Sequence, residues 1–168
     1  MESADTGYYL NSEEKQLGSG SRQQIVTFVK DASARSTLWW VRPGYDESNN
    51  DEQEYPSEAT CQLATPVACG TRIRLTHVDT MRNLHSHEYK SPLSSQQEVT
   101  AYGQGDAKGD AGDDWIVECD GKYWKRDAVF RLVRSFLLRL LFLLDDNVEN
   151  DNLPIKTTVA GFIGNTGS

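Results

Sequence analysis

Short segments in which apolar and polar residues alternate run along much of this chain, and they predict β-strands. The clearest is Thr71–Val78, where Ile73 and Leu75 fall on one face and Arg72 and Arg74 on the other. This alternation predicts a strand that is buried on one face only. β-branched and aromatic residues predict further strands at Ile25–Phe28, Leu38–Val41, Asn83–His87, Gln97–Tyr102 and Trp115–Cys119. Segments rich in Gly, Ser, Asp or Pro separate these strands and predict turns.

The strand pattern occurs twice with a nearly constant spacing. The matching pairs are Thr6 and Thr80, Leu10 and Leu84, Thr27 and Thr100, and Trp39 and Trp115, which lie 74, 74, 73 and 76 residues apart. Such regular spacing is typical of a repeat architecture. Four short strands cannot cover their own apolar face, whereas three such units around a pseudo-threefold axis can. We therefore predict an all-β fold, a β-trefoil built from three four-stranded repeats.

The predicted trefoil is a single domain over residues 1–168. Its repeats cover about 1–56 and 57–124, followed by a degenerate third repeat over about 125–168. The first copy starts close to its first turn, and the third departs from the pattern after Val129–Leu132. We expect the fold to be incomplete at these two ends, and closure of the barrel stays open. The apolar run Phe136–Leu144 has no assigned role, and with nine residues and an internal Arg139 it is too short to span a membrane.

Composition narrows the classes of partner. The 168 residues carry a formal net charge of −8 and have a mean hydropathy of −0.60, which fit a soluble globular protein. An acidic chain is poorly suited to nucleic acid or to an anionic membrane surface, because both require a basic face. The chain shows neither a secretory signal at its start nor a retention tail at its end.

Three cysteines, Cys61, Cys69 and Cys119, are the disulfide candidates. One disulfide with one free thiol is one arrangement, with Cys61 and Cys69 the nearest pair in sequence. Three free thiols in a reducing compartment are the alternative, and the sequence leaves both open.

Several segments in the second copy and its flanks resemble one known family in order and register. They are Cys69–Thr71, Ile73–Thr80, Arg82–His87, Ser91–Ser94, Gln97–Val99, Asp113–Trp115 and Tyr123–Trp124. Together they resemble a MIR domain, the module shared by protein O-mannosyltransferases, inositol trisphosphate receptors and ryanodine receptors. Within that superfamily the chain is most similar to the stromal cell-derived factor 2-like proteins of the endoplasmic reticulum lumen. The likeness covers roughly Thr6–Leu132.

The resemblance implies a non-enzymatic interaction module in lumenal protein folding and quality control. Its implied partners are lumenal chaperones or client polypeptides. The alternative is a carbohydrate-binding module related to the MIR domain of protein O-mannosyltransferases, with mannose-containing glycans as ligands. We expect no catalytic residues and no cofactor, because no nucleophile is arranged with a base.

A shallow ligand site is predicted where aromatic and planar polar side chains occur together, since sugars bind aromatic faces flanked by hydrogen-bonding groups. The candidates are Arg82, His85, His87, Tyr89, Gln97, Tyr102 and Asp114. His85 and His87 share one face of a strand, and His77 lies across the neighbouring turn, so a metal site is conceivable in principle. We favour structural hydrogen bonding for these histidines and predict no metal. Asp113 is interpreted as a turn residue, and Trp39, Trp115 and Trp124 as core residues.

Overall fold

The structure of the chain is a computed structural model that describes residues 1–16, 18–44, 65–91 and 95–134. These residues form eight strands, two 3-10 helices and no α-helix. The strands are β1 (Tyr9–Gln16), β2 (Gln24–Val29), β3 (Trp39–Pro43), β4 (Arg72–His77), β5 (Asn83–Lys90), β6 (Gln97–Tyr102), β7 (Trp115–Cys119) and β8 (Phe130–Arg134). The short helices are η1 (Arg35–Thr37) and η3 (Ala111–Asp113). The prediction of an all-β fold is confirmed.

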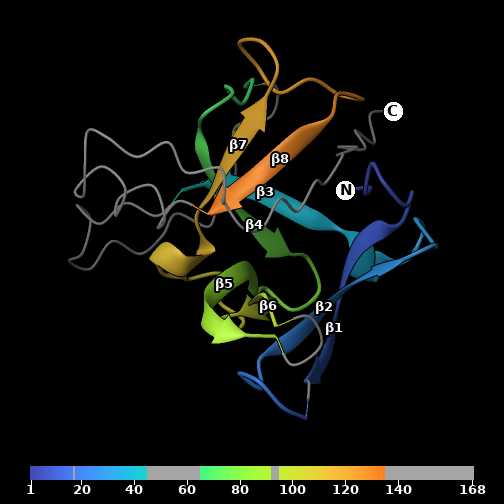
Figure 1. Ribbon diagram of the computed structural model, residues 1–168, viewed down its shortest axis with the longest axis vertical. Coiled ribbons are helices and arrows are strands. Elements are labelled where there is room, and N and C mark those ends of the chain that lie inside the picture. The colour runs from blue at the N-terminus through green and yellow to red at the C-terminus, as the bar shows by residue number, and fades with distance from the viewer. Residues whose placement is uncertain (17, 45–64, 92–94, 135–168) are drawn as a thin grey trace.

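All eight strands belong to one antiparallel sheet. Its order is β1-β2-β6-β5-β4-β7-β8, and β3 pairs with β4 outside this path. Figure 1 shows two parts of this arrangement, with β7 and β8 side by side at one end and the β1–β2 and β5–β6 ribbons at the other. The strand β4 connects them, because it pairs with β3, β5 and β7.

The hairpins β1–β2 and β5–β6 have the same register. In the first, Leu10 lies opposite Phe28 and Ser12 opposite Val26. In the second, the residues 74 and 73 positions later are paired in the same way, so that Leu84 faces Ala101 and Ser86 faces Val99. Each hairpin also has an irregularity after its serine. The sequence repeat therefore corresponds to a repeated hairpin geometry.

The core is built from apolar residues of both hairpins and of the strands β4, β7 and β8. Its buried members are Leu10, Ile73, Leu75, Leu84, Trp115, Val117, Phe130 and Leu132, with Trp39 and Trp124 packed against them. Each copy holds its tryptophan in the same way. The indole N–H of Trp39 donates to the carbonyl of Leu10 at 3.1 Å, and that of Trp115 donates to the carbonyl of Leu84 at 2.8 Å. This hydrogen bond ties β3 to the β1–β2 hairpin and β7 to the β5–β6 hairpin.

The structure corrects one expectation about β4. Alternation predicted a strand with one exposed face, but every residue from Ile73 to His77 is buried. Arg74 is only 5% exposed, and its Nε donates to the carbonyl of Pro43. The reason is that β4 has strands on both sides and that polar contacts from these neighbours cover its second face.

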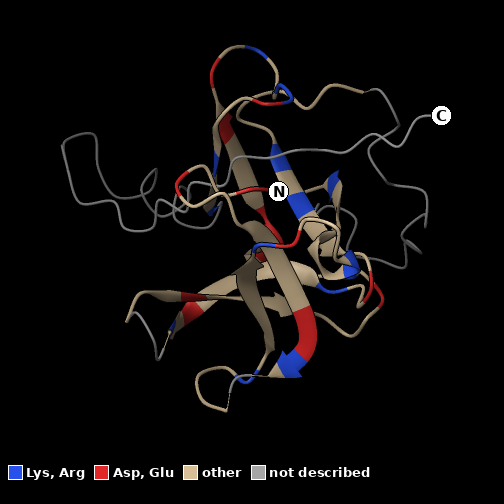
Figure 2. Cartoon of the chain, turned by 90° about the vertical axis from the view of Figure 1, so that its right-hand side faces the viewer, with Lys and Arg blue, Asp and Glu red and all other residues tan. Residues whose placement is uncertain are grey.

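The third predicted copy is described only at its start. Phe130–Arg134 forms β8 and pairs with β7 from Cys119–Phe130 to Trp115–Arg134. The apolar run Phe136–Leu144 and the rest of that copy lie outside the described residues. In the described part of the chain, basic and acidic residues are interspersed over strands and loops in the view of Figure 2.

The equivalent hydrogen bonds of Trp39 and Trp115 lead to a prediction about stability. Trp115→Phe is expected to lower the free energy of unfolding by about 2 kcal/mol, because the buried carbonyl of Leu84 loses its donor. Trp40→Phe is the matched control, since Trp40 is 40% exposed, and this change is expected to cost less than about 0.5 kcal/mol. Chemical denaturation measures both values. Equal losses in the two variants would contradict the role of the indole N–H.

Candidate functional site

The central polar group of the second copy is the carboxylate of Asp113, which is 0% exposed. The segment Asp110–Asp113 folds as a capped 3-10 turn. The Asp110 side chain accepts from the Gly112 N–H at 2.7 Å, and Asp113 Oδ2 accepts from the Asp110 N–H at 3.0 Å. This reciprocal capping, the pattern of a capping box, fixes the carboxylate of Asp113 against β5.

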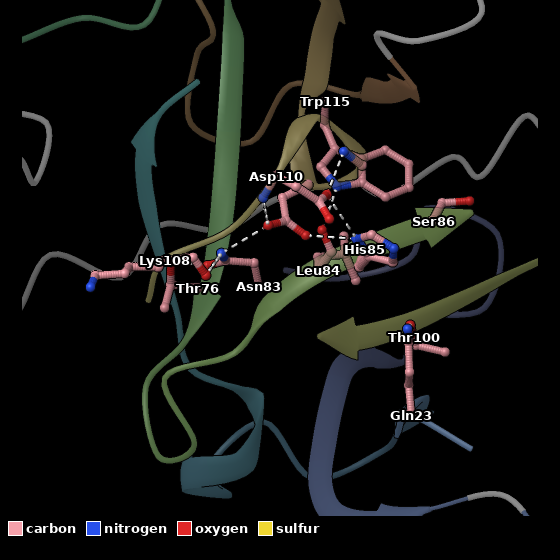
Figure 3. A network of polar contacts seen from close by, with 12 residues as sticks. Gln23, Thr76, Asn83, Leu84, His85, Ser86, Thr100, Lys108, Asp110 and Trp115 are labelled. Atoms are coloured by element: carbon pink, nitrogen blue, oxygen red, sulfur yellow. Dashed lines mark hydrogen bonds and ion pairs between the residues drawn. The ribbon is translucent and has the colours of Figure 1, made fainter. Parts of the chain in front are cut away.

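Two side chains of β5, those of Asn83 and His85, reach this carboxylate. Figure 3 labels both of them beside Asp110. His85 Nδ1 lies 2.8 Å from Asp113 Oδ1, and Asn83 Nδ2 donates to Asp113 Oδ2 at 3.1 Å. The Thr76 hydroxyl of β4 donates in turn to Asn83 Oδ1 at 2.7 Å. Because an ionised carboxylate only accepts, Nδ1 carries the hydrogen and Nε2 is left to face away from Asp113. We call Asp113, His85, Asn83 and Thr76 the Asp113 network.

Two glycines allow this close packing. A Cβ on Gly112 would lie 2.4 Å from His85 Cε1, and a Cβ on Gly109 would lie 1.8 Å from Asp113 Oδ2. No side chain fits at either distance without displacing the network. The Gly/Asp-rich loop is thus shaped by contact with β5.

Four rings lie in a row beside the Asp113 network. The ring centroids of Tyr102 and His85 are 4.8 Å apart, those of His85 and His87 5.4 Å, and those of His87 and Tyr89 4.9 Å. The two ends are open to solvent, with Tyr89 65% and Tyr102 41% exposed. We call these four residues the ring row. The row crosses β5 and β6, with the two exposed tyrosines at its ends and His85, only 6% exposed, within it.

His87 links the ring row to a buried carboxylate. Its Nε2 lies 3.3 Å from Glu98 Oε2 without a well-aligned hydrogen bond, and the same oxygen accepts from the Ser21 N–H at 3.1 Å. Burial lowers the pKa of His87, and nearby His85 acts in the same direction, whereas Glu98 opposes it. His87 is therefore held mainly neutral at neutral pH.

The structure gathers four of the seven predicted site residues, namely those of the ring row. Arg82 lies apart, and its Nη1 donates to Gln24 Oε1 at 3.1 Å. Gln97 pairs with Lys90 near the end of the hairpin. Asp114 is 1% exposed and lies 3.4 Å from Arg72 Nη1, whereas its neighbour Asp113 contacts His85 of the ring row.

Sequence reasoning missed Asp113 and Asn83 as members of the site. A comparison of the two copies in the sequence could have identified Asp113. The residue two positions before the repeated tryptophan is Thr37 in the first copy and Asp113 in the second. Likewise Asn11 stands where the second copy has His85. The two differences occur together, because the histidine and the aspartate form one hydrogen bond.

The three histidines do not converge. His77 Nε2 lies 3.1 Å from the Ser36 carbonyl, and its Nδ1 lies 2.9 Å from the Thr80 hydroxyl. Within the described ranges, the only group with metal-ligand spacing is His85, Asp110 and Asp113, whose ligand atoms lie within 4.8 Å of one another. Both oxygens of Asp113 already accept hydrogen bonds, which explains this cluster without an ion.

Ser86 is not placed to act as a nucleophile that the His85–Asp113 pair could activate. This residue lies next to His85 but on the opposite face of β5, since it pairs with Val99 where His85 pairs with Thr100. Its hydroxyl donates to the Glu98 carbonyl at 3.2 Å. The pair serves to orient the imidazole within the ring row.

His77 gives a prediction about pH. Burial lowers the pKa of His77 below its ordinary value of 6.5, while the Ser36 carbonyl and Asp79 act in the opposite direction. A histidine whose pKa is lower in the folded state than in the unfolded state stabilises the fold fully at pH values above its pKa in the unfolded state. This contribution is lost as the pH falls through its pKa in the folded state. We expect wild-type stability to fall below about pH 6.5 more steeply than that of His77→Gln. Thermal unfolding between pH 7.5 and pH 5 measures the slope of stability against pH for both proteins. His87 is present in both and contributes equally, so parallel slopes would contradict the prediction.

Comparison with known proteins identifies the family. The MIR domain family model matches residues 4–137. The chain belongs to the MIR domain family. The resemblance inferred from its sequence is confirmed.

Relatives of this MIR domain include stromal cell-derived factor 2 of Homo sapiens, 44% identical over 126 residues that make up 75% of this chain and 54% of the relative. Stromal cell-derived factor 2-like protein 1 of Homo sapiens is 43% identical over 73% of this chain and 49% of its own length. The chain thus spans about half the length of these curated relatives.

Two solved structures resemble this MIR domain. The stromal cell-derived factor 2-like protein from Arabidopsis thaliana has a TM-score of 0.66 and 33% identity, covering 79% of this chain and 67% of the other. The S. cerevisiae protein O-mannosyltransferase complex bound to the sugar donor has a TM-score of 0.59 and 31% identity, covering 75% of this chain and 17% of the other. In the described part of the chain, no helix has the length and hydropathy needed to span a bilayer.

Proposed function

We propose that this MIR domain is a single β-trefoil with repeats over about 1–56, 57–124 and 125–168. The equal register of the β1–β2 and β5–β6 hairpins supports the first two units. The pairing of β8 with β7 supports the start of a third, because β8 follows β7 as β4 follows β3.

We further propose that the domain acts as a non-enzymatic interaction module in protein folding and quality control in the endoplasmic reticulum lumen. Membership in the MIR family with stromal cell-derived factor 2 relatives carries this proposal. The Cys69–Cys119 disulfide supports an oxidising compartment, since such bonds form and persist there. Its partners are lumenal chaperones or client polypeptides.

The test of this role uses purified partners. The immobilised domain should retain lumenal Hsp70 and J-domain proteins and a reduced, unfolded client protein. The same domain unfolded by reduction and alkylation is the control for non-specific capture. Retention of none of the three by the folded domain would reject the interaction role.

A second function, carbohydrate binding, is favoured by the ring row. The exposed side chains of Tyr102 and Tyr89 supply aromatic rings, and the largely buried rings of His85 and His87 lie between them. Stacking of apolar sugar faces on such rings, with neighbouring hydrogen-bonding groups, suits a mannose-containing glycan. The corresponding positions of the first copy hold Asn11, Glu13, Lys15 and Val29, so of these two copies only the second has this set of rings.

Glycan binding is tested by calorimetry with a mannose oligosaccharide. Tyr102→Ala and Tyr89→Ala are expected to weaken binding at least about tenfold, which corresponds to the loss of about 1.4 kcal/mol. Tyr123→Ala is the matched control, because Tyr123 is a 39% exposed tyrosine elsewhere on the surface. Equal effects of all three substitutions, or no binding by the wild type, would reject this function.

A further inference from the structure

The imidazole of His85 carries an acceptor atom that is unused within the described residues. Its Nδ1–H points toward Asp113 Oδ1, 2.8 Å away, so Nε2 of the neutral ring keeps a lone pair. No described residue donates to Nε2 of His85, and unlike Nε2 of His87 this atom is not fully buried. In Figure 3 only one ring nitrogen of His85 lies on a dashed line. The fold therefore holds Nε2 ready to accept a hydrogen bond from outside the chain.

A second acceptor lies beside His85. Asp110 Oδ1 is 3.6 Å from His85 Nδ1 and accepts from the Gly112 N–H, whereas Asp110 Oδ2 has no hydrogen bond in the described ranges. The side chain of Asp110 is 56% exposed, so Oδ2 can reach a ligand in solvent. The ring of Tyr102, which is 41% exposed, lies 4.8 Å from that of His85. We call His85, Asp110 and Tyr102 the acceptor site.

The first copy indicates that this side of the hairpin stays open when a further copy follows. Glu13 and Lys15 hold the positions of His87 and Tyr89 in the β1–β2 hairpin, and the copy that follows that hairpin is described. With that copy in place, the side chains of Glu13 and Lys15 are 44% and 75% exposed. Because the β5–β6 hairpin has the same register, its corresponding side is expected to be open to solvent as well.

Most of the charges around the acceptor site are negative. The carboxylates of Asp113 and Glu98 are buried next to the ring row, at 0% and 2% exposed, and Asp110 lies at its surface. Arg134 is the basic side chain that interacts with this region. Burial lowers the pKa of Arg134, whereas Glu88 and Asp110 oppose this shift. The carboxylates outnumber the guanidinium, so the local field disfavours an anionic ligand.

We propose that the acceptor site binds an uncharged, polyhydroxylated ligand such as a neutral oligosaccharide. Two hydroxyl groups of the ligand donate to His85 Nε2 and Asp110 Oδ2, and the Tyr102 ring packs against its carbon atoms. Asp113 is a positioning residue, because it keeps the hydrogen of His85 on Nδ1. This inference rests on the proposed carbohydrate binding and adds that neutral glycans are accepted and anionic glycans rejected.

The probes are two neutral trisaccharides, mannotriose and maltotriose, each paired with its own phosphate monoester. Calorimetry measures the binding of all four to the folded domain. Whichever neutral trisaccharide binds is expected to bind at least about tenfold more tightly than its phosphate ester, because the phosphate brings like charge toward the carboxylates. Equal affinities within a pair would overturn the proposal, as would binding of neither trisaccharide.

Nitrogen NMR of the histidine side chains tests the role of His85 in the wild-type protein. At about pH 8, Nε2 of His85 is expected to carry no hydrogen, and its resonance should shift when the trisaccharide that binds is added. A hydrogen on Nε2 in the free protein, or an unchanged resonance in the complex, would overturn the proposal. This measurement requires no substitution, so it does not depend on the stability of an Asp113 variant.

Asp110→Asn tests the second acceptor. The substitution replaces the charged carboxylate by an amide, and we expect it to weaken binding of the neutral trisaccharide at least about fivefold and to reduce the preference over the phosphate ester. Asp106→Asn is the matched control, because Asp106 is an exposed aspartate of the same loop that accepts from the Lys108 N–H at 3.0 Å. Equal effects at positions 106 and 110 would reject the contribution of Asp110.

The outcomes separate the acceptor site from the proposed binding of mannose. If maltotriose binds in preference to its phosphate ester and mannotriose does not bind, the mannose function fails and the acceptor site stands. If mannotriose binds no more tightly than its phosphate ester, or if His85 Nε2 carries the hydrogen, carbohydrate binding stands and the acceptor site fails.

Discussion

Reduction of the Cys69–Cys119 disulfide is expected to lower the free energy of unfolding by about 4 kcal/mol. The two cysteines are 50 residues apart in sequence. Cys69 lies just before β4 and Cys119 ends β7, so the bond closes a loop that contains most of the second copy. In the chain-entropy model, a cross-link over a loop of this length restricts the unfolded chain by about 4 kcal/mol.

Urea denaturation with and without a reductant measures this effect. The variant Cys69→Ala/Cys119→Ala should show the lowered stability under both conditions. Cys61→Ala is the matched control and should keep the full response to the reductant. A wild-type protein that unfolds at the same urea concentration in both conditions would contradict the prediction.

The second large effect is expected for Asp113→Asn, at about 3 kcal/mol of lost stability. The substitution keeps the shape of the side chain but replaces one accepting oxygen by an NH2 group. That group then faces either the amide of Asn83 and the Asp110 N–H, which only donate, or His85 Nδ1, which can accept only if its hydrogen moves to Nε2. A donor left unpaired in a fully buried site costs several kcal/mol when the original acceptor was charged.

Asp110→Asn is the control for this prediction. Asp110 is 56% exposed at its side chain and accepts one bond from the Gly112 N–H. Asn keeps an accepting oxygen and caps a helix as well as Asp does, so this substitution is expected to cost less than about 0.5 kcal/mol. Chemical denaturation measures the stability of both variants. Similar losses at positions 110 and 113 would show that the Asp113 network is not the main anchor of the loop.

Much of the strand layout was predictable from sequence, because alternation and turn chemistry act over a few residues. The predicted strand at Gln97–Tyr102 agrees with β6, and that at Trp115–Cys119 agrees with β7. Equivalence of the two hairpins was also visible, since Leu10 and Leu84 occupy the same place in each register. The prediction for Thr71–Val78 was right in extent but wrong about its exposed face.

The ligand site itself stays a prediction. The structure places four of its seven predicted residues, His85, His87, Tyr89 and Tyr102, next to one another. Asp114 was chosen over Asp113, although it is Asp113 that contacts His85. Two adjacent aspartates cannot be distinguished by spacing alone, since the turn of η3 decides which one faces β5.

The cysteine pairing shows the same limit of local reasoning. The sequence left the pairing open, with Cys61 and Cys69 as the nearest pair, whereas the structure joins Cys69 with Cys119. That pair forms because β4 and β7 are neighbours in the sheet and bring the two ends of the second copy together.

The sequence by itself determined the all-β class, the position of most strands, the two-copy pattern and the likeness to MIR domains. These features depend on short-range periodicity and on residue types at fixed spacing, which a linear chain already contains. Only the tertiary structure decided the disulfide, the Asp113 network and the burial of Arg74. Each of these depends on segments distant in the chain meeting in the sheet, where contact and exclusion of water set the energy of a polar group.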